Sequence, residues 1–150
     1  MSEVARPRPL VLLSSVSSDS HTWNLVFLQL LLEETGHDVV NLGACVPDDL
    51  LLSECLAHRP DAVVISTVNG HGHVDGRRLV ARLRADERLS GLPVVIGGKL
   101  GVGGGRDAAL ARELVDAGFD AVFADGPDVR EFVGYLDSVV PVPALESGVA

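Results

Sequence analysis

The chain has 150 residues, 47% of which are apolar, and a formal net charge of −9. This length and composition suit a folded domain with a full hydrophobic core and exclude a long disordered chain. The acidic balance, with Lys99 as the only lysine, excludes the clustered basic surface that nucleic acids and anionic membranes require.

Short apolar segments alternate with longer amphipathic segments along the chain. The predicted strands are Leu10–Val16, Asp38–Gly43, Ala62–Thr67, Val94–Gly98 and Ala121–Ala124. The predicted helices are Trp23–Thr35, Asp48–His58, Gly76–Ala85, Asp107–Ala117 and Asp128–Asp137. The strands are rich in valine, isoleucine and leucine, which is typical of strands buried on both faces of a parallel sheet.

This alternation predicts an α/β fold: a flavodoxin-like (Rossmann-like), doubly wound, five-stranded parallel sheet with helices on both faces. We expect a single domain over residues 1–150, with an ordered core of about 8–140 and flexible termini. Leu25, Leu28 and Leu32 recur at helical spacing in the first helix, so we expect this helix to be largely covered and Trp23 to lie over its start.

The ends of the chain and its cysteines indicate the compartment. The first residues, MSEVARPRP, lack the apolar core of a signal peptide, and no apolar run is long enough to span a membrane. Cys45 and Cys55 match no redox or zinc spacing, and we expect two reduced, buried thiols. We therefore predict a cytoplasmic protein.

Ligands of open α/β sheets bind outside the carboxyl ends of the strands, so the loops at those ends are the candidate site. A phosphorylated receiver domain needs an aspartate at the end of the third strand, where this chain has Ser66 and Thr67. The first loop lacks the glycines of a dinucleotide-binding fold, and Gly98-Lys99 is followed by Leu100 rather than by the Ser or Thr of a P-loop. A flavin site at the serine-rich first loop stays open as an alternative.

The histidines elsewhere in the chain carry weaker signals. His71 and His73 could bind a metal, but the loop offers only Asp75 as a further ligand, so a solvated glycine-rich loop is the favoured interpretation. His37 and His58 lie at predicted helix ends, and we assign them no function.

Polar and small residues at one rim of the predicted sheet suggest a large planar ligand with a metal. His21 offers a ring nitrogen to the metal, and Asp19 can accept a hydrogen bond from the other ring nitrogen, which fixes the tautomer. Ser66 can bind a heterocycle nitrogen, and Gly97 and Gly98 allow a bulky group to approach the backbone.

These residues resemble the motifs of the cobalamin (B12)-binding domain family, which read Asp-x-His-x-x-Gly, then Ser-x-Leu, then Gly-Gly. The corresponding stretches here are Asp19–Asn24, Ser66–Val68 and Gly97-Gly98. The resemblance covers roughly residues 8–140. It is strongest to the small subunits of glutamate (methylaspartate) mutases.

The resemblance implies a cofactor and a set of contacts. His21 would coordinate the cobalt of adenosylcobalamin, which is held with its own base off the metal. The nucleotide tail would enter a slot between the sheet and the first helix, where Ser66 would contact the dimethylbenzimidazole and Gly97 and Gly98 would line the slot. Asp19, Ser20, Thr22 and Val68 complete the implied cofactor-binding set.

The resemblance also implies a function that requires two chains. The chain would be the cobalamin-binding small subunit of an adenosylcobalamin-dependent carbon-skeleton mutase, inactive alone. A separate barrel-shaped large subunit would bind the substrate, and homolysis of the Co–C bond would start the radical interconversion of glutamate and 3-methylaspartate. A homodimer is also left open.

Two positions depart from the family motif: Asn24 stands in place of the glycine and Val68 in place of the leucine. Valine at position 68 is smaller than leucine by about one methylene, so it changes the pocket wall only slightly. Asn24 would narrow the slot or add a hydrogen bond there, and the alternative is that it only helps to start the helix. The loop Asn69–His73 also differs from the aromatic-Gly-Gln-Gly loop of the family.

Two alternatives to the mutase interpretation therefore remain. One is a corrinoid carrier for another B12-dependent enzyme. Methyl carriers commonly have a helical domain before the α/β part, and the first predicted strand here begins near Leu10, which favours the mutase type. The other is a relative that has lost the cofactor and acts as a binding partner, which only Asn24 favours.

Overall fold

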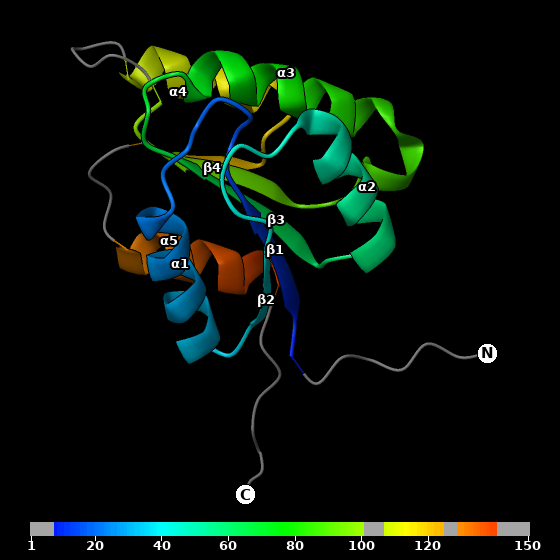
Figure 1. The fold of residues 1–150 in the computed structure, drawn as a ribbon, viewed down its shortest axis with the longest axis vertical. Helices are drawn as coiled ribbons and strands as arrows, with labels where there is room; N and C mark the ends of the chain where they lie inside the picture. Colours follow the sequence, from blue (N-terminus) through cyan, green and yellow to red (C-terminus); the bar gives the residue numbers. More distant parts are fainter. Residues whose placement is uncertain (1–7, 101–106, 125–128, 141–150) are drawn as a thin grey trace, which may run out of the picture.

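The computed structural model describes residues 8–100, 107–124 and 129–140 (Figure 1). Its strands are β1 (Leu10–Ser14), β2 (Asp38–Asn41), β3 (Ala62–Thr67), β4 (Val94–Gly98) and β5 (Ala121–Ala124). Its helices are α1 (Trp23–Glu34), α2 (Asp48–His58), α3 (Gly72–Ala85), α4 (Asp107–Ala117) and α5 (Val129–Val139), with a short 3-10 helix η1 (Glu87–Leu89) before β4.

The five strands form one parallel sheet in the order β2-β1-β3-β4-β5. This order confirms the flavodoxin-like, doubly wound prediction. The chain leaves β1 toward β2 on one side and then returns to β3 on the other side. The carboxyl ends of β1 and β3 therefore flank the point where the winding reverses, which is where ligands of this fold bind.

Two apolar layers hold the helices to the sheet, because the side chains of each strand alternate between its faces. On one face, Leu25 and Leu32 of α1 and Leu136 of α5 pack with Val64 and Val95 of the sheet. The other face is covered by α2, α3 and α4, whose buried residues include Leu51, Leu79 and Leu114. Figure 1 shows α1 and α5 at the lower left of the sheet, α3 and α4 along its top and α2 at its right.

The start of α3 differs from the prediction. The helix begins at Gly72 rather than at Gly76, so His73 and Asp75 lie on its first turn and not in a solvated loop. Gly72 is buried, and a Cβ atom there would lie 2.4 Å from Cγ2 of Thr67. The glycine-rich sequence thus reflects close packing of the helix start against β3. His73 Nε2 lies 2.6 Å from Oε1 of Glu113 on α4.

The exposure of α1 is also different from the prediction. Leu25 and Leu32 are buried, but Trp23, Val26, Phe27 and Leu30 are 52–65% exposed, so the helix is covered on one side only. Trp23, which was expected to cover the helix start, is itself 65% exposed. Apolar residues surround the whole helix, and such a pattern does not indicate which side faces the sheet.

The two cysteines differ in their exposure. Cys55 is buried, but Cys45 is exposed, so the prediction of two buried thiols is wrong for Cys45. Within the described ranges, no helix is both long and apolar enough to cross a bilayer. The predicted flexible termini and the predicted helix start at Asp128 lie outside the described residues.

Candidate functional site

The predicted site residues come together at the carboxyl edge of the sheet. Asp19 and His21 lie in the loop after β1, and Ser66 is next to last in β3. Ser66 is in register with Gly97 and its neighbour Thr67 with Gly98, both at the end of β4. The parallel sheet therefore brings three segments that are distant in sequence to one edge.

Asp19 connects the loop after β1 with the end of β3. Its carboxylate is fully buried and accepts hydrogen bonds from both sides. Oδ1 accepts from the backbone N–H of His21 at 2.9 Å and lies 2.7 Å from its Nδ1. Oδ2 accepts from Oγ1 of Thr67 at 2.5 Å and from the backbone N–H of Val68 at 2.8 Å. Thr67 was not among the predicted site residues.

These contacts keep Asp19 ionised. Burial by itself raises the pKa of the carboxyl group, because a charge is costly to enclose. The hydrogen bonds from Thr67, from the backbone of His21 and Val68 and from the His21 ring outweigh this cost and lower the pKa from 3.8 to about 2. A fixed negative charge therefore lies beside the imidazole at neutral pH.

His21 presents one ring nitrogen to the outside. Nδ1 faces Asp19, so this nitrogen carries the proton when the ring is neutral, and Nε2 is then the acceptor. Nε2 makes no hydrogen bond to any residue that the structure describes, and the side chain is 48% exposed. A neutral imidazole that donates to a carboxylate and offers its other nitrogen is the usual form of a metal-ligating histidine.

The remaining predicted residues of the first loop lie on its surface. Ser20 and Thr22 are exposed. The carbonyl oxygen of Thr22 accepts hydrogen bonds from the backbone of Leu25 and Val26, so Thr22 starts α1. Val68 is half-buried and contributes its backbone N–H to Asp19, a role that the sequence did not indicate.

Asn24 and Ser66 form a buried pair between α1 and β3. Nδ2 of Asn24 donates to Oγ of Ser66 at 2.8 Å. Thr22 precedes the helix as its N-cap, so the interpretation of Asn24 as a residue that only starts the helix is wrong. The hydroxyl that the sequence assigns to a heterocycle is instead engaged by Asn24 in this structure.

A polar network fixes the same loop from the other side. Arg78 on α3 donates to both carboxylate oxygens of Asp48 at 2.7 and 3.2 Å, to Asp75 at 3.0 Å and to Oγ of Ser17 at 3.0 Å. Ser18 donates to Asp75. No local pattern in the sequence indicates this network, because its members lie on α2, on α3 and in the loop after β1.

Gly98 has a backbone conformation that requires glycine. Its φ is +106°, and a Cβ atom there would lie 2.0 Å from the carbonyl oxygen of Thr67. The backbone of β4 thus lies against β3 next to Ser66, and Lys99 N–H donates to the same Thr67 oxygen at 2.8 Å. Gly98 therefore shapes the edge of the site through the backbone.

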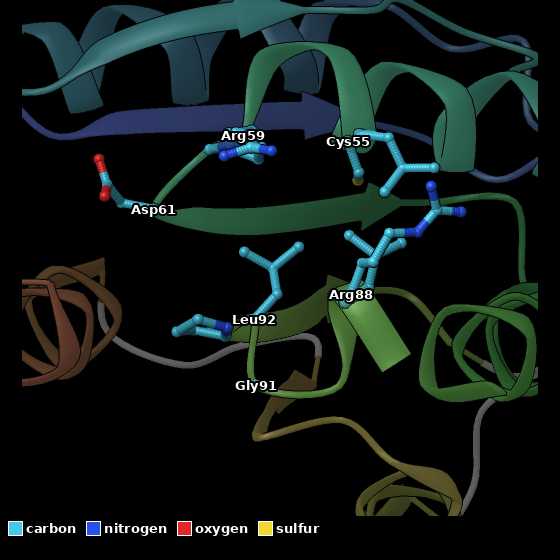
Figure 2. A pocket seen from close by; sticks show the side chains of 10 residues that line it. Cys55, Arg59, Asp61, Arg88, Gly91 and Leu92 are labelled. Carbon is cyan, nitrogen blue, oxygen red and sulfur yellow. The ribbon is translucent and has the colours of Figure 1, made fainter. Parts of the chain in front are cut away.

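A separate cavity of about 650 Å³ lies at the opposite edge of the sheet (Figure 2). Its lining includes Arg59 and Asp61 just before β3 and Leu92 just before β4. These positions are at the amino ends of the strands, whereas His21 follows the carboxyl end of β1. None of the predicted site residues lines this cavity.

The described residues contain no group of three or more His, Cys, Asp or Glu side chains arranged to hold a metal ion. The donor set at the carboxyl edge is a single imidazole nitrogen backed by a carboxylate. Such a set does not complete a structural metal site, but it fits an ion that brings its other ligands with it, as the cobalt of a corrin ring does. The side chains present therefore fit a corrinoid.

The chain matches a known family and a named relative in sequence. A family model described as "B12 binding domain" matches residues 9–133. The glutamate mutase sigma subunit of Treponema denticola is 30% identical over 139 residues, which cover 92% of this chain and 98% of that protein. The sequence similarity thus extends over nearly the whole length of both chains.

The structural comparisons concern the fold alone, because the identities are low. A cobalamin-binding protein from Desulfitobacterium hafniense aligns with a TM-score of 0.71 and 22% identity, over 88% of this chain and 59% of that chain. The receiver domain of Francisella response regulator 1452 aligns with a TM-score of 0.67 and 20% identity, over 88% of this chain and 96% of that chain. The same fold therefore carries unrelated functions.

Proposed function

Because the chain belongs to the B12-binding domain family, we propose that it is the cobalamin-binding small subunit of an adenosylcobalamin-dependent mutase of the glutamate mutase type. The full-length similarity to a protein named glutamate mutase sigma subunit supports the mutase type. The observation that carries the proposal is the open Nε2 of His21, with Nδ1 held by a buried, ionised Asp19.

Each residue of the site has a defined part in this proposal. His21 Nε2 coordinates cobalt, while Asp19 holds the ring orientation and the tautomer and makes the nitrogen a stronger ligand. Thr67 and Val68 hold Asp19 in place. Ser66, Gly97 and Gly98 bind the base of the nucleotide tail, with Ser20, Thr22 and Val68 at the edge of the site.

When it is bound, adenosylcobalamin supplies the radical chemistry by homolysis of its Co–C bond, and the protein supplies position and electrostatics. The relatives of similar length are named as sigma subunits of glutamate mutase, which is a designation for one part of a larger enzyme. We therefore assign the substrate site to a separate large, barrel-shaped subunit. In this arrangement the chain has no isomerase activity by itself.

A second candidate is a relative that no longer binds the cofactor. The observation that favours it is the Asn24–Ser66 hydrogen bond, which occupies the hydroxyl assigned to the nucleotide base. A titration of the purified chain with cobalamin separates the two candidates. Binding supports the mutase subunit, whereas no absorbance change at millimolar cobalamin supports the second candidate and contradicts the first.

The mutase type itself is tested by reconstitution. The chain, adenosylcobalamin and a large subunit encoded by a neighbouring reading frame should together convert glutamate to 3-methylaspartate, and omission of any component should abolish turnover. Turnover by this chain and the cofactor without the large subunit would contradict the proposal. Cobalamin binding without turnover in the reconstituted mixture would instead favour a corrinoid carrier.

A further inference from the structure

Asn24 and Ser66 close the space between α1 and the end of β3. Each residue is only 6% exposed, and the 2.8 Å hydrogen bond between Nδ2 and Oγ joins the helix to the strand. Within the part of the chain that the structure describes, neither of these two polar groups has another hydrogen-bond partner. An incoming group therefore meets Ser66 with its hydroxyl already engaged.

The surroundings of this pair are made by residues that share its face of the sheet. Ser66 has the same orientation as Val64, and Gly97 the same as Val95, and both valines pack in the layer formed with α1 and α5. Gly97 adds no side chain to this layer. A Cβ atom at Gly97 would lie 2.9 Å from the carbonyl oxygen of Phe123 on β5, so the backbone packing favours glycine at this position beside Ser66.

The other end of the Asn24 carboxamide is unsatisfied. Oδ1 is buried and has no hydrogen-bond partner among the described residues. Enclosing a carbonyl oxygen without a donor is unfavourable, because the oxygen loses its hydrogen bonds to water. The closed pair is thus incompletely satisfied, and rotation of the side chain away from Ser66 would let Oδ1 regain a donor from solvent or from a ligand.

We propose that Asn24 is a specificity-determining residue whose carboxamide must leave Ser66 before the base of a nucleotide tail can bind there. This inference rests on the proposed function. The penalty falls only on corrinoids that carry a nucleotide tail, because a corrinoid without one makes no demand on Ser66. Removal of the carboxamide should therefore raise the affinity for the form with a tail relative to the affinity for the form without one.

The test compares two probes and two substitutions. The affinities of the native chain, Asn24→Gly and Asn24→Ala are measured by absorbance titration for cobalamin and for cobinamide, which has the same ring but no nucleotide. Losing one competing hydrogen bond and the side-chain volume should raise the affinity for cobalamin by about tenfold. The affinity for cobinamide should change by less than about twofold.

A matched control separates this effect from weakening of the helix. Glycine destabilises a helix interior wherever it is placed. Val26→Gly introduces glycine on the exposed side of α1, away from Ser66, and should leave the ratio of the two affinities unchanged. Asn24→Ala, which favours the helix, should change the ratio in the same direction as Asn24→Gly.

The outcomes distinguish this inference from the proposed function. If both corrinoids bind but the Asn24 variants leave the ratio unchanged or lower it, Asn24 is not a competitor for Ser66, and the inference is wrong. If neither corrinoid binds to the native chain or to any variant, the proposed function is wrong and the inference falls with it. A rise in the ratio for both Asn24 variants, with no rise for Val26→Gly, supports it.

Discussion

Nδ1 of His21 lies 2.7 Å from a carboxylate oxygen of Asp19, and Asp19 is in turn anchored to the end of β3. The imidazole is therefore oriented by a carboxylate that is hydrogen-bonded both within its own loop and to the end of β3. In the proposed function this relationship preorganises His21 for cobalt, because the ring need not be ordered when the metal binds.

The first prediction concerns the pH dependence of stability. The pKa of Asp19 is lowered from 3.8 to about 2 in the folded chain, so the unfolded chain takes up the proton first as the pH falls. The stabilisation is complete above pH 4 and is lost as the pH falls toward 2, and it amounts to roughly 2 kcal/mol. Urea unfolding between pH 2 and pH 7 measures it.

Asp19→Asn provides the comparison for this measurement. The variant should lack the component of the pH dependence that lies between pH 4 and 2, and should be less stable at pH 7 by about the same 2 kcal/mol. It should also bind cobalamin about 10–100-fold more weakly, because the amide orients the His21 ring less well. Superimposable pH profiles for the two proteins would show that Asp19 does not carry this effect.

The second prediction concerns Arg78. Its hydrogen bonds to Asp48, followed by the one to Asp75, raise the pKa of the guanidinium further above its ordinary value. Arg78→Met leaves two mostly buried carboxylates without their cation and should lower the free energy of unfolding by about 1–3 kcal/mol. This range is lower than for a fully buried ion pair, because the Arg78 side chain is half-exposed and solvent screens its charge.

Arg82→Met is a suitable control for that substitution. Arg82 lies one turn further along α3 and pairs with Asp49, whose side chain is 82% exposed, so its removal should cost less than about 0.5 kcal/mol. Both values come from urea unfolding at neutral pH. Equal losses in the two variants would mean that the Arg78 network has no special role in holding the loop.

The third prediction concerns Gly98. Alanine there must adopt a φ of +106° and place Cβ against the Thr67 carbonyl oxygen, so Gly98→Ala should cost at least about 2 kcal/mol. Gly91→Ala serves as the control, because a Cβ atom at Gly91 meets nothing within 4 Å. Thermal unfolding compares the two variants, and a loss of stability no larger for Gly98→Ala than for Gly91→Ala would contradict the strain at Gly98.

The fourth prediction concerns the two thiols. Burial, with a further contribution from the nearby charge of Glu54, raises the pKa of Cys55 to about 12, so its reactive thiolate is nearly absent at pH 8. Cys45 is exposed. A disulfide-exchange reagent should therefore modify Cys45 in the folded chain and both cysteines in denaturant. Rapid labelling of folded Cys45→Ser would show that Cys55 is accessible after all.

Much of the fold follows from the sequence because each element carries its own signal. The strands Ala62–Thr67, Val94–Gly98 and Ala121–Ala124 are runs of apolar residues with clear ends, and the structure has the same bounds. The spacing of Asp19 and His21 already places their side chains within reach of each other. The sheet edge on which they lie follows from the alternation of strands and helices.

The rest of the site depends on tertiary contacts that have no local signal. Thr67 and Val68 meet Asp19 only because β1 and β3 are neighbours in the sheet. Asn24 reaches Ser66 because α1 packs with that side toward β3. Apolar residues occur on all sides of this helix, so the sequence does not indicate which side faces the sheet. Arg78 likewise contacts Asp48 only because α2 and α3 lie side by side in the folded chain.

The central claim is that His21 ligates cobalt through Nε2. The most direct measurement is the electron paramagnetic resonance spectrum of the Co(II) form of cobalamin bound to protein labelled with 15N only at histidine. The account predicts that labelling converts the nitrogen superhyperfine triplets into doublets and that His21→Ala abolishes the dependence on the label. Triplets that persist in the labelled protein would show that the nitrogen comes from the cofactor's own base, and the claim would be wrong.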